Sequence, residues 1–219
     1  MPTIVDQLSL GPLGTNCYVV RAARDASAAV VVDPSGTEAE LARGLASVGA
    51  ECVAILVTHS HFDHILGLAD LADSTGAPVY APRAELVVLQ EPSAFAPPGI
   101  GLRPATPDVL LAGGERLELA GIGFDVLAVP GHSPGHLAFA VDGALLSGDV
   151  LFAGSVGRTD LPGGDWWRLL DSIGRLVDAY PPETLVYPGH GPTTTLGEEL
   201  LRNPFLADLR SERQGRTTG

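Results

Sequence analysis

The stretch THSHFDH, residues 58–64, constrains the fold of this chain more than any other feature. It places three histidines and one aspartate within six residues, and it directly follows the apolar run VAILV at 53–57. That run is short, rich in branched aliphatic residues and bounded by polar residues, which predicts a buried strand. The imidazoles and the carboxylate therefore stand at the end of a strand.

The crowding of these side chains predicts a metal site. A buried imidazole needs partners for both ring nitrogens, and a buried carboxylate without a partner is costly. A shared cation satisfies both, and imidazole with carboxylate favours zinc or iron over magnesium or calcium. The alternative is a solvated loop that happens to be rich in histidine. Half of the six histidines lie in this one stretch, which argues against that alternative.

The spacing of the cluster predicts more than one ion. In an extended segment, residues two apart share a face, so His59 and His61 can converge on one ion. Asp63 and His64 are offset from that pair and could serve a second ion close by. Four ligands do not complete two coordination spheres, so further histidines or aspartates are expected at the ends of other strands. Three predicted strand ends carry one beside a glycine: His132, Asp149 and His190.

Composition limits the class of protein. A chain of 219 residues with 45% apolar and 18% charged residues is expected to form one domain, or two small ones, with a real core. No apolar run approaches the roughly 20 residues that span a bilayer. The N-terminus shows no secretory signal, so a cytoplasmic location is predicted. Cys17 and Cys52 are in no metal-ligand spacing and are expected to be buried free thiols.

The charge balance argues against a nucleic-acid partner. The chain has 26 acidic and 13 basic residues, a formal net charge of −13, and all its basic residues other than histidine are arginine. Phosphate backbones require a basic surface, which this composition does not offer. Strongly anionic substrates are also disfavoured unless metal ions and arginine offset the negative field locally.

Hydrophobic periodicity predicts alternating strands and helices. A hairpin is expected over residues 4–20, and a helix capped by Thr37 with Glu40 is expected to run to about residue 48. The other predicted helices lie at 65–75, 84–89, 166–179 and 196–202. The other predicted strands lie at 28–32, 53–57, 79–80, 117–119, 124–129, 137–141, 144–146 and 184–187. The proline-rich segment 91–108 has no periodic pattern, and both a binding loop and a solvated connection fit it.

Taken together, these motifs resemble the metallo-β-lactamase superfamily, and within it the glyoxalase II-like hydrolases. The resemblance rests on HSHFDH at 59–64 followed in order by His132, Asp149 and His190. Supporting pieces are NCY at 16–18, Asp33 after its strand, GRTD at 157–160, GHGP at 189–192 and NPF at 203–205. It implies an α/β fold, the four-layer αβ/βα sandwich of two mixed β-sheets with helices on the outer faces. A single domain of this kind is expected over 1–210, and the polar residues 211–219 are expected to form a frayed tail.

The resemblance assigns a role to each candidate site residue. It assigns His59, His61 and His132 to the first metal. It assigns Asp63, His64 and His190 to the second metal, with Asp149 as a bridge between the two. The implied cofactors are two divalent metal ions, with zinc favoured and iron or manganese as alternatives. Asp33 is expected to orient a ligand imidazole, and His136 is expected to be structural. Arg158 either contacts substrate or pairs with Asp160.

The activity implied by the resemblance is thioester hydrolysis. A hydroxide bridging the two ions would attack the acyl carbon of an S-acylthiol, and Asp63 could accept the proton. The expected partner is a small acyl-thiol or ester substrate, with no nucleic acid and no membrane. Glutathione-specific members carry an extra C-terminal helical region and basic residues. This chain ends soon after Phe205 and has no lysine, which argues against glutathione as the acyl carrier.

Three alternatives stay open at this point. A persulfide dioxygenase of the same fold would bind one iron through the positions of His59, His132 and Asp149. A lactone or other ester hydrolase would use the same apparatus, because fold does not fix function. A metal-stabilised scaffold would keep its partner after the replacement Asp63→Asn, whereas an enzyme would lose turnover. Metal content discriminates the dioxygenase from the hydrolases.

Overall fold

One strand of the first sheet is apolar on both faces. In β3 (Ala28–Val32), Val30 and Val32 pack into one hydrophobic cluster, while Ala29 and Val31 pack into another on the opposite face. Successive side chains of a strand point to opposite faces, so a strand that is apolar at every position must be covered on both sides. This pattern places β3 inside a layered structure.

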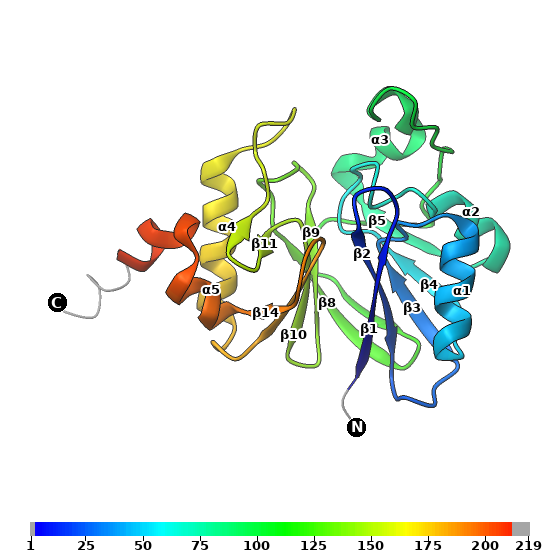
Figure 1. Ribbon diagram of the computed structural model, residues 1–219, viewed down its shortest axis with the longest axis horizontal. Helices are drawn as coiled ribbons and strands as arrows, with labels where there is room; N and C mark the ends of the chain where they lie inside the picture. The colour runs from blue at the N-terminus through cyan, green and yellow to red at the C-terminus, as the bar shows by residue number, and fades with distance from the viewer. Residues whose placement is uncertain (1–2, 212–219) are drawn as a thin grey trace.

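The computed structural model describes residues 3–211 and contains two mixed six-stranded sheets (Figure 1). The first sheet has the strand order β1-β2-β3-β4-β5-β6. Its first three strands are antiparallel, and β3 to β6 are parallel. The remaining strands of this sheet are β1 (Ile4–Leu10), β2 (Thr15–Arg21), β4 (Glu51–Leu56), β5 (Val79–Pro82) and β6 (Val109–Leu111).

The second sheet has the order β14-β13-β10-β9-β8-β7. Strands β7 to β10 form an antiparallel meander, β13 lies parallel to β10, and β14 closes the edge antiparallel to β13. Its strands are β7 (Arg116–Leu119), β8 (Ile122–Ala128), β9 (Leu137–Val141), β10 (Ala144–Gly148), β13 (Leu185–Pro188) and β14 (Thr194–Thr195). A separate short hairpin pairs β11 (Leu151–Phe152) with β12 (Ser155–Val156).

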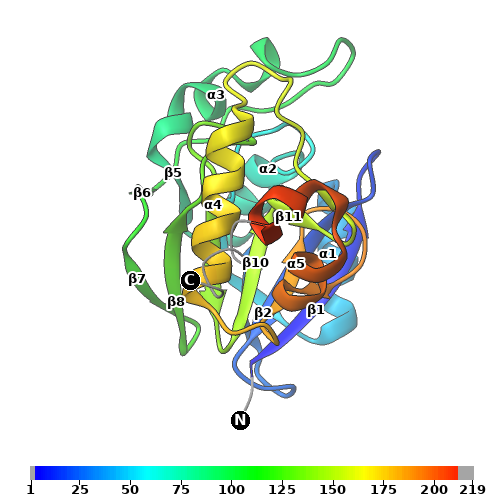
Figure 2. The ribbon, with the colours of Figure 1, turned by 90° about the vertical axis from the view of Figure 1, so that its left-hand side faces the viewer.

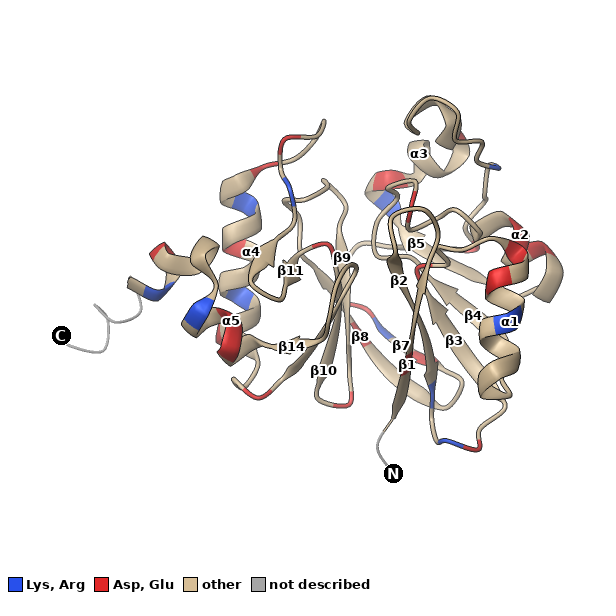
Figure 3. Cartoon of the chain, in the orientation of Figure 1, with Lys and Arg blue, Asp and Glu red and all other residues tan. Residues whose placement is uncertain are grey.

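Helices cover the outer faces of both sheets. On the first sheet lie α1 (Glu38–Val48), α2 (Leu68–Thr75) and the short α3 (Leu86–Gln90), and on the second lie α4 (Trp166–Ala179) and α5 (Leu196–Arg202) (Figures 1 and 2). A third apolar cluster fills the space between the sheets. Charged side chains lie mostly on helices and connections and leave the strands largely apolar (Figure 3). The predicted four-layer fold is confirmed.

Capping fixes several helix bounds where the sequence predicts them. Thr37 accepts from the backbone N–H of Glu40 while the Glu40 carboxylate accepts from the N–H of Thr37, and Gly49 ends α1 with a φ of 65°. Asp165 caps α4 by accepting from the N–H of Arg168 at 3.1 Å. The predicted bounds of these helices are therefore confirmed.

Some predicted bounds are wrong. The helix expected from residue 65 begins only at Leu68, because residues 62–67 form turns and a bend, with the His64 N–H donating to the His61 carbonyl at 3.0 Å. The helix expected over 84–89 begins as the 3-10 turn η1 (Arg83–Glu85) and continues as α3. Strands β6, β11, β12 and β14 were not predicted, because two or three residues are too few to show a period.

Other predictions concern single features. Cys17 and Cys52 are buried and free, as predicted. None of the helices within residues 3–211 combines the length and apolarity needed to cross a membrane. Of the predicted tail 211–219, only Ser211 is among the described residues. The assignment of 1–210 to a single domain stays a prediction.

Candidate metal centre

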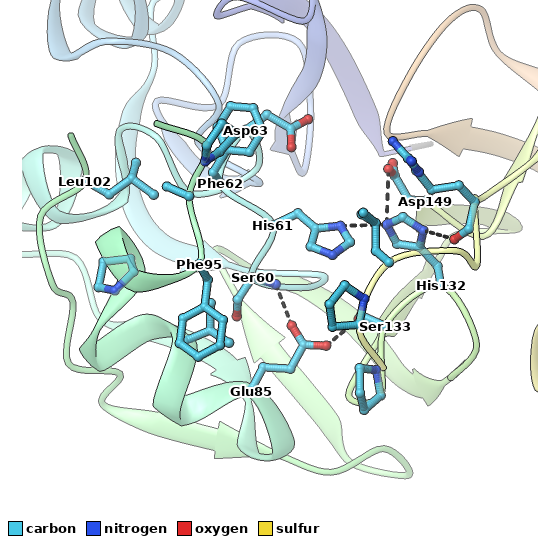
Figure 4. Close-up of a pocket in the computed structure, with 18 of the residues that line it drawn as sticks. Ser60, His61, Phe62, Asp63, Glu85, Phe95, Leu102, His132, Ser133 and Asp149 are labelled. Carbon is cyan, nitrogen blue, oxygen red and sulfur yellow. Dashed lines mark hydrogen bonds and ion pairs between the residues drawn. The ribbon is translucent and has the colours of Figure 1, made fainter. Parts of the chain in front are cut away.

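The turn that follows β4 carries the first group of candidate ligands. His59 Nε2 lies 3.1 Å from His61 Nδ1. His132, in the loop after β8, brings its Nε2 within 2.8 Å of the same His61 atom (Figure 4). The three ligand atoms of this group all lie within 4.8 Å of one another. The structure thus brings together the three residues predicted for the first metal, and we call them the first trio.

The second trio combines the same turn with a late loop. Asp63 and His64 stand on the turn, and His190 follows β13. His190 Nε2 lies 3.2 Å from Asp63 Oδ2, and His64 Nε2 lies 3.6 Å from it. These ligand atoms also lie within 4.8 Å of one another. They are the residues predicted for the second metal.

Asp149 lies between the two trios. Its Oδ2 is 3.5 Å from His132 Nε2 in the first trio and 3.6 Å from His190 Nε2 in the second. Its Oδ1 is 3.3 Å from His64 Nε2, again in the second trio. One carboxylate therefore reaches histidines of both trios, which is the position that a bridging ligand requires.

Glycines allow the loops to approach this closely. A Cβ on Gly189 would lie 2.0 Å from Asp149 Oδ1, so no side chain fits beside the carboxylate. Gly148 has a φ of +50°, and a Cβ there would lie 2.6 Å from Thr58 Oγ1. Any larger residue at either position would have to displace the site.

Asp33 fixes the orientation of His64. Its carboxylate accepts hydrogen bonds from the Thr58 N–H at 2.8 Å and the Thr58 hydroxyl at 2.6 Å, and it lies 2.8 Å from His64 Nδ1. The hydrogen of that ring is thereby held on Nδ1, and Nε2 is left to face Asp149. Asp33 has a φ of 52°, unusual for a residue other than glycine. Asp33, His59 and His64 also form a compact group, but the oxygens of Asp33 are already used.

Hydrogen bonds also fix the rings of two other histidines, His132 and His136. His132 Nδ1 lies 2.8 Å from the Arg158 carbonyl, so it donates there and its Nε2 faces the first trio. His136 Nε2 accepts from the Asp149 N–H at 3.0 Å, and its ring stacks on His59 with centroids 4.5 Å apart. His136 therefore packs against the ligands and supports the loop that carries Asp149.

Arg158 pairs with Asp160. The guanidinium donates to the two carboxylate oxygens at 2.8 and 2.7 Å on the protein surface. Of the two roles predicted for Arg158, the ion pair is the one that this geometry shows. Its side chain still borders the cavity described below.

Two site residues were missed in the sequence. Glu85, at the start of α3, is buried and accepts from the N–H of Ser60 at 2.6 Å, from the N–H of Gly135 at 3.0 Å and from the Ser133 hydroxyl (Figure 4). It thereby ties the early ligand turn to the loop of His132. Thr15 donates its hydroxyl to Asp63 Oδ2 at 2.7 Å. Neither belongs to a motif, and the only signal for Glu85 is a carboxylate in an apolar segment.

Burial keeps several imidazoles neutral. It lowers the pKa of His59 well below the ordinary value, and the neighbouring His64 adds to the effect. It likewise lowers the pKa of His61 to about 4 and the pKa of His132 below its ordinary value. Neutral rings keep the lone pair that a metal ion requires.

The carboxylates stay ionised. Burial opposes this, but His190 and His64 bring the pKa of Asp63 to about 2, and His64 brings the pKa of Asp149 well below its ordinary value. The pKa of His64 is raised despite burial, because Asp149 and Asp33 flank its ring. The centre thus concentrates buried negative charge among imidazoles.

This donor set fits two metal ions. His64 Nε2 and Asp149 Oδ1 are buried and form no hydrogen bond with any residue in 3–211, although they are 3.3 Å apart. Buried polar atoms without hydrogen bonds are costly, and ions between the trios would satisfy them. Imidazole nitrogens and carboxylate oxygens are ligands for zinc and iron. The two trios with Asp149 between them are consistent with a dinuclear metal site.

A cavity of about 750 Å³ opens over the trios. His61, Asp63, His132, Asp149 and His190 form one end of its lining. Side chains of the proline-rich segment 91–108 form much of the rest, including Phe95 and Leu102 (Figure 4). Volumes in this range suit a small-molecule ligand.

Comparison with known proteins decides the family. The model of the metallo-beta-lactamase superfamily matches residues 10–190. The chain belongs to this superfamily. It is 35% identical over 205 residues to "Probable metallo-hydrolase YqgX" of Bacillus subtilis (strain 168), a match that covers 91% of this chain and 96% of that protein. It is 32% identical over 190 residues to "Hydroxyacylglutathione hydrolase GloC" of Haemophilus influenzae, covering 83% and 89%.

Solved metallo-beta-lactamase folds match the whole architecture. The crystal structure of BLEG-1 B3 metallo-beta-lactamase has a TM-score of 0.87 and 40% identity, over 93% of this chain and all of that one (100%). The crystal structure of TTHA1623 in a di-iron-bound form has a TM-score of 0.80 and 41% identity, over 92% and 100%. With the two trios, these similarities identify a metal-dependent hydrolase of the superfamily.

Proposed function

We propose that the protein is a thioesterase of the glyoxalase II type, which hydrolyses a small S-acylthiol with two zinc ions. The observation that carries the proposal is Asp149, whose carboxylate lies within 3.6 Å of histidines of both trios. The similarity to GloC at 32% identity supports the thioester as the scissile bond. The excess of acidic residues, 26 against 13 basic, supports a small molecule over a nucleic acid as partner.

The first trio would hold one ion and the second trio the other, with Asp149 shared between them. When bound, the ions supply polarisation of the acyl oxygen and a lower pKa for water. Asp63 lines the cavity as an ionised carboxylate and accepts the proton that the attacking water loses. Thr15 and His190 hold Asp63 Oδ2 in place, at 2.7 and 3.2 Å. The carbon–sulfur bond then breaks, and the thiolate leaves without needing a proton.

The completeness of the second trio favours two ions over one. A persulfide dioxygenase would use a single iron through His59, His132 and Asp149. Asp63, His64 and His190 would then remain as a compact cluster with ligand atoms within 4.8 Å and no ion to hold. Iron remains an alternative metal for a two-ion site, because the TTHA1623 structure is di-iron-bound.

Metal analysis combined with a substrate panel tests the proposal. The purified protein is analysed for bound metals and assayed on thioesters, lactones and lactams, with chelated protein as the control. The proposal expects two zinc ions per chain and thioesters as the best substrates. One iron per chain with thiol-dependent oxygen uptake would contradict the proposal and favour the dioxygenase. A preference for lactones or lactams would contradict the thioester as the substrate class.

A further inference from the structure

The cavity over the trios has two chemically different ends. The metal-ligand end is polar, whereas another part of the lining carries Phe62, Phe95 and Leu102 (Figure 4). Phe62 comes from the early turn, and the other two come from the segment 91–108. Val88 of α3 and Leu13 of the β1–β2 turn extend the apolar lining. We call the set Leu13, Phe62, Val88, Phe95 and Leu102 the apolar wall.

The cavity offers few cationic side chains to an anionic substrate arm. Among the described residues that line it, Arg158 is the one arginine. Its Nε and one terminal nitrogen donate to the Asp160 carboxylate at 2.8 and 2.7 Å. The whole chain has no lysine. The carboxylates of Asp63, Glu85 and Asp149 also border the space. With Asp63 and Asp149 engaged by the ions of the proposed function, a substrate arm that carries carboxylates would find one arginine, already paired with Asp160, and the carboxylate of Glu85.

Contacts outside the cavity hold the segment that carries part of the apolar wall. Leu102 is buried in the cluster beneath the first sheet, and its carbonyl accepts from the Ser93 hydroxyl at 3.1 Å. The next residue, Arg103, forms ion pairs with Asp70 at 2.5 Å and Asp73 at 2.6 Å on α2. Phe95 nevertheless remains 58% exposed. Covering an exposed aromatic side chain of this size with an apolar group removes apolar surface from water, which favours binding.

We infer that the apolar wall binds an uncharged, apolar arm of the substrate beside its scissile bond, and that Phe95 determines the preferred arm length. The inference rests on the proposed thioesterase function for the reaction. The apolar chemistry of the substrate arm is inferred from the residues of the apolar wall. The arm can belong to the acyl group or to the leaving thiol, because both extend from the same carbon. In either case its chemistry is aliphatic or aromatic, and not that of a charged peptide.

Turnover of a homologous series tests the inference. Acetyl, butanoyl, hexanoyl and octanoyl thioesters of neutral N-acetylcysteamine are compared with the same acyl groups on glutathione and on octanethiol. With the arm on the acyl group, kcat/KM rises about fourfold per added methylene in the N-acetylcysteamine series. With the arm on the thiol, kcat/KM instead rises from N-acetylcysteamine to octanethiol. In both cases the glutathione thioesters are the poorer substrates.

Two phenylalanine variants provide matched controls. Phe95→Ala is expected to reduce the gain in kcat/KM per methylene to less than about twofold. Phe205→Ala removes a similarly exposed ring, 47% against 58%, that packs beside Trp166 and is not among the residues lining the cavity. It should keep the wild-type dependence on chain length. An unchanged slope in Phe95→Ala, a flat wild-type series or a preference for glutathione would overturn the inference.

Binding separates this inference from the proposed function. Ketone analogues, in which a methylene replaces the sulfur, are titrated calorimetrically into the wild type and into Phe95→Ala. One outcome is that no thioester is hydrolysed, but the octyl analogue binds more tightly than the ethyl analogue and Phe95→Ala removes the difference. That result would support the apolar arm and contradict the thioesterase function. If thioesters are hydrolysed but neither turnover nor binding depends on arm length, the thioesterase stands and the arm fails.

Discussion

At the scale of the residue, Asp33 shows how one side chain organises the centre. It stands at the end of β3 with a left-handed backbone, and its two oxygens hold both Thr58 and His64. A residue kept in an unfavourable conformation is a mark of a functional site. The carboxylate also supplies the negative charge that raises the pKa of His64. Its influence on the metal centre is therefore electrostatic as well as geometric.

Replacing Asp33 with asparagine should weaken metal binding. Asparagine tolerates the left-handed backbone but removes the charge facing His64 Nδ1, so the affinity for the second ion is expected to fall about 10- to 100-fold. Titration of chelated protein with zinc measures this. Asp142→Asn is the matched control, because Asp142 is exposed and also has a positive φ, of 46°. Equal affinities in the two variants would show that Asp33 does not act through His64.

Replacing Asp63 with asparagine should abolish most turnover. The amide cannot accept the proton of the attacking water, so kcat is expected to fall by about 100-fold or more. Steady-state kinetics on the best thioester measures it, with bound metal determined in parallel. Asp165→Asn should leave kcat unchanged, because asparagine caps α4 as well as aspartate does. Full activity in Asp63→Asn would remove Asp63 from the mechanism.

At the scale of the element, Glu85 connects segments that no local pattern relates. It lies at the start of α3, yet it accepts from Ser60 on the early turn and from Ser133 and Gly135 on the loop after β8. These partners are 25 to 50 residues away along the chain. The two loops that supply the first trio are thus held in register by one buried carboxylate.

Glu85→Gln should loosen this junction. The amide oxygen can accept from the two N–H groups only in part, and the new NH₂ group faces donors, so at least one buried donor loses its partner. The free energy of unfolding is expected to fall by about 2 kcal/mol. Chemical denaturation of the metal-free protein measures it. Glu91→Gln, at the exposed end of α3, should change stability little. Equal midpoints for the two variants would contradict the junction role of Glu85.

The elements show which parts of the structure the sequence can predict. The bounds of helices α1 and α4 can be predicted because their caps are local, as in the mutual bonds of Thr37 and Glu40. The start of α2 is not predicted, because the apolar pattern at residues 65–66 continues into turns shaped by the ligand loop. Short strands such as β14 exist only through pairing with a partner strand, which no local pattern reports.

The metal centre also contains residues that the sequence predicts and residues that it does not. The candidate ligands could be predicted because they are chemically unusual and stand at strand ends, and the structure brings His132, Asp149 and His190 to the early turn. The roles of Glu85 and Thr15 could not, because each acts through a long-range hydrogen bond from a segment without a motif. The shape of the apolar wall also depends on packing between distant segments.

At the scale of the whole molecule, the sandwich does not depend on metal for its core. Three apolar clusters fill the space between the sheets and beneath the helices on each side. The candidate ligands stand at one edge, outside these clusters. Ions bound to the folded state alone add stability without defining the fold.

Chelation should therefore lower thermal stability without unfolding the chain. The far-UV circular dichroism spectrum is expected to stay unchanged, while Tm falls by about 20 °C, as for two ions each at about 1,000 times its Kd in a protein of this size. A thermal scan with and without chelator measures both quantities, and readdition of zinc should restore Tm. Loss of the circular dichroism signal on chelation would instead make the metal part of the folding core.

Anomalous diffraction from crystals of the zinc-loaded protein tests the central claim most directly. We expect two anomalous peaks per chain, one among His59, His61 and His132 and one among Asp63, His64 and His190, with the Asp149 carboxylate between them. A single peak, or peaks away from these side chains, would contradict the dinuclear centre and the hydrolase chemistry built on it.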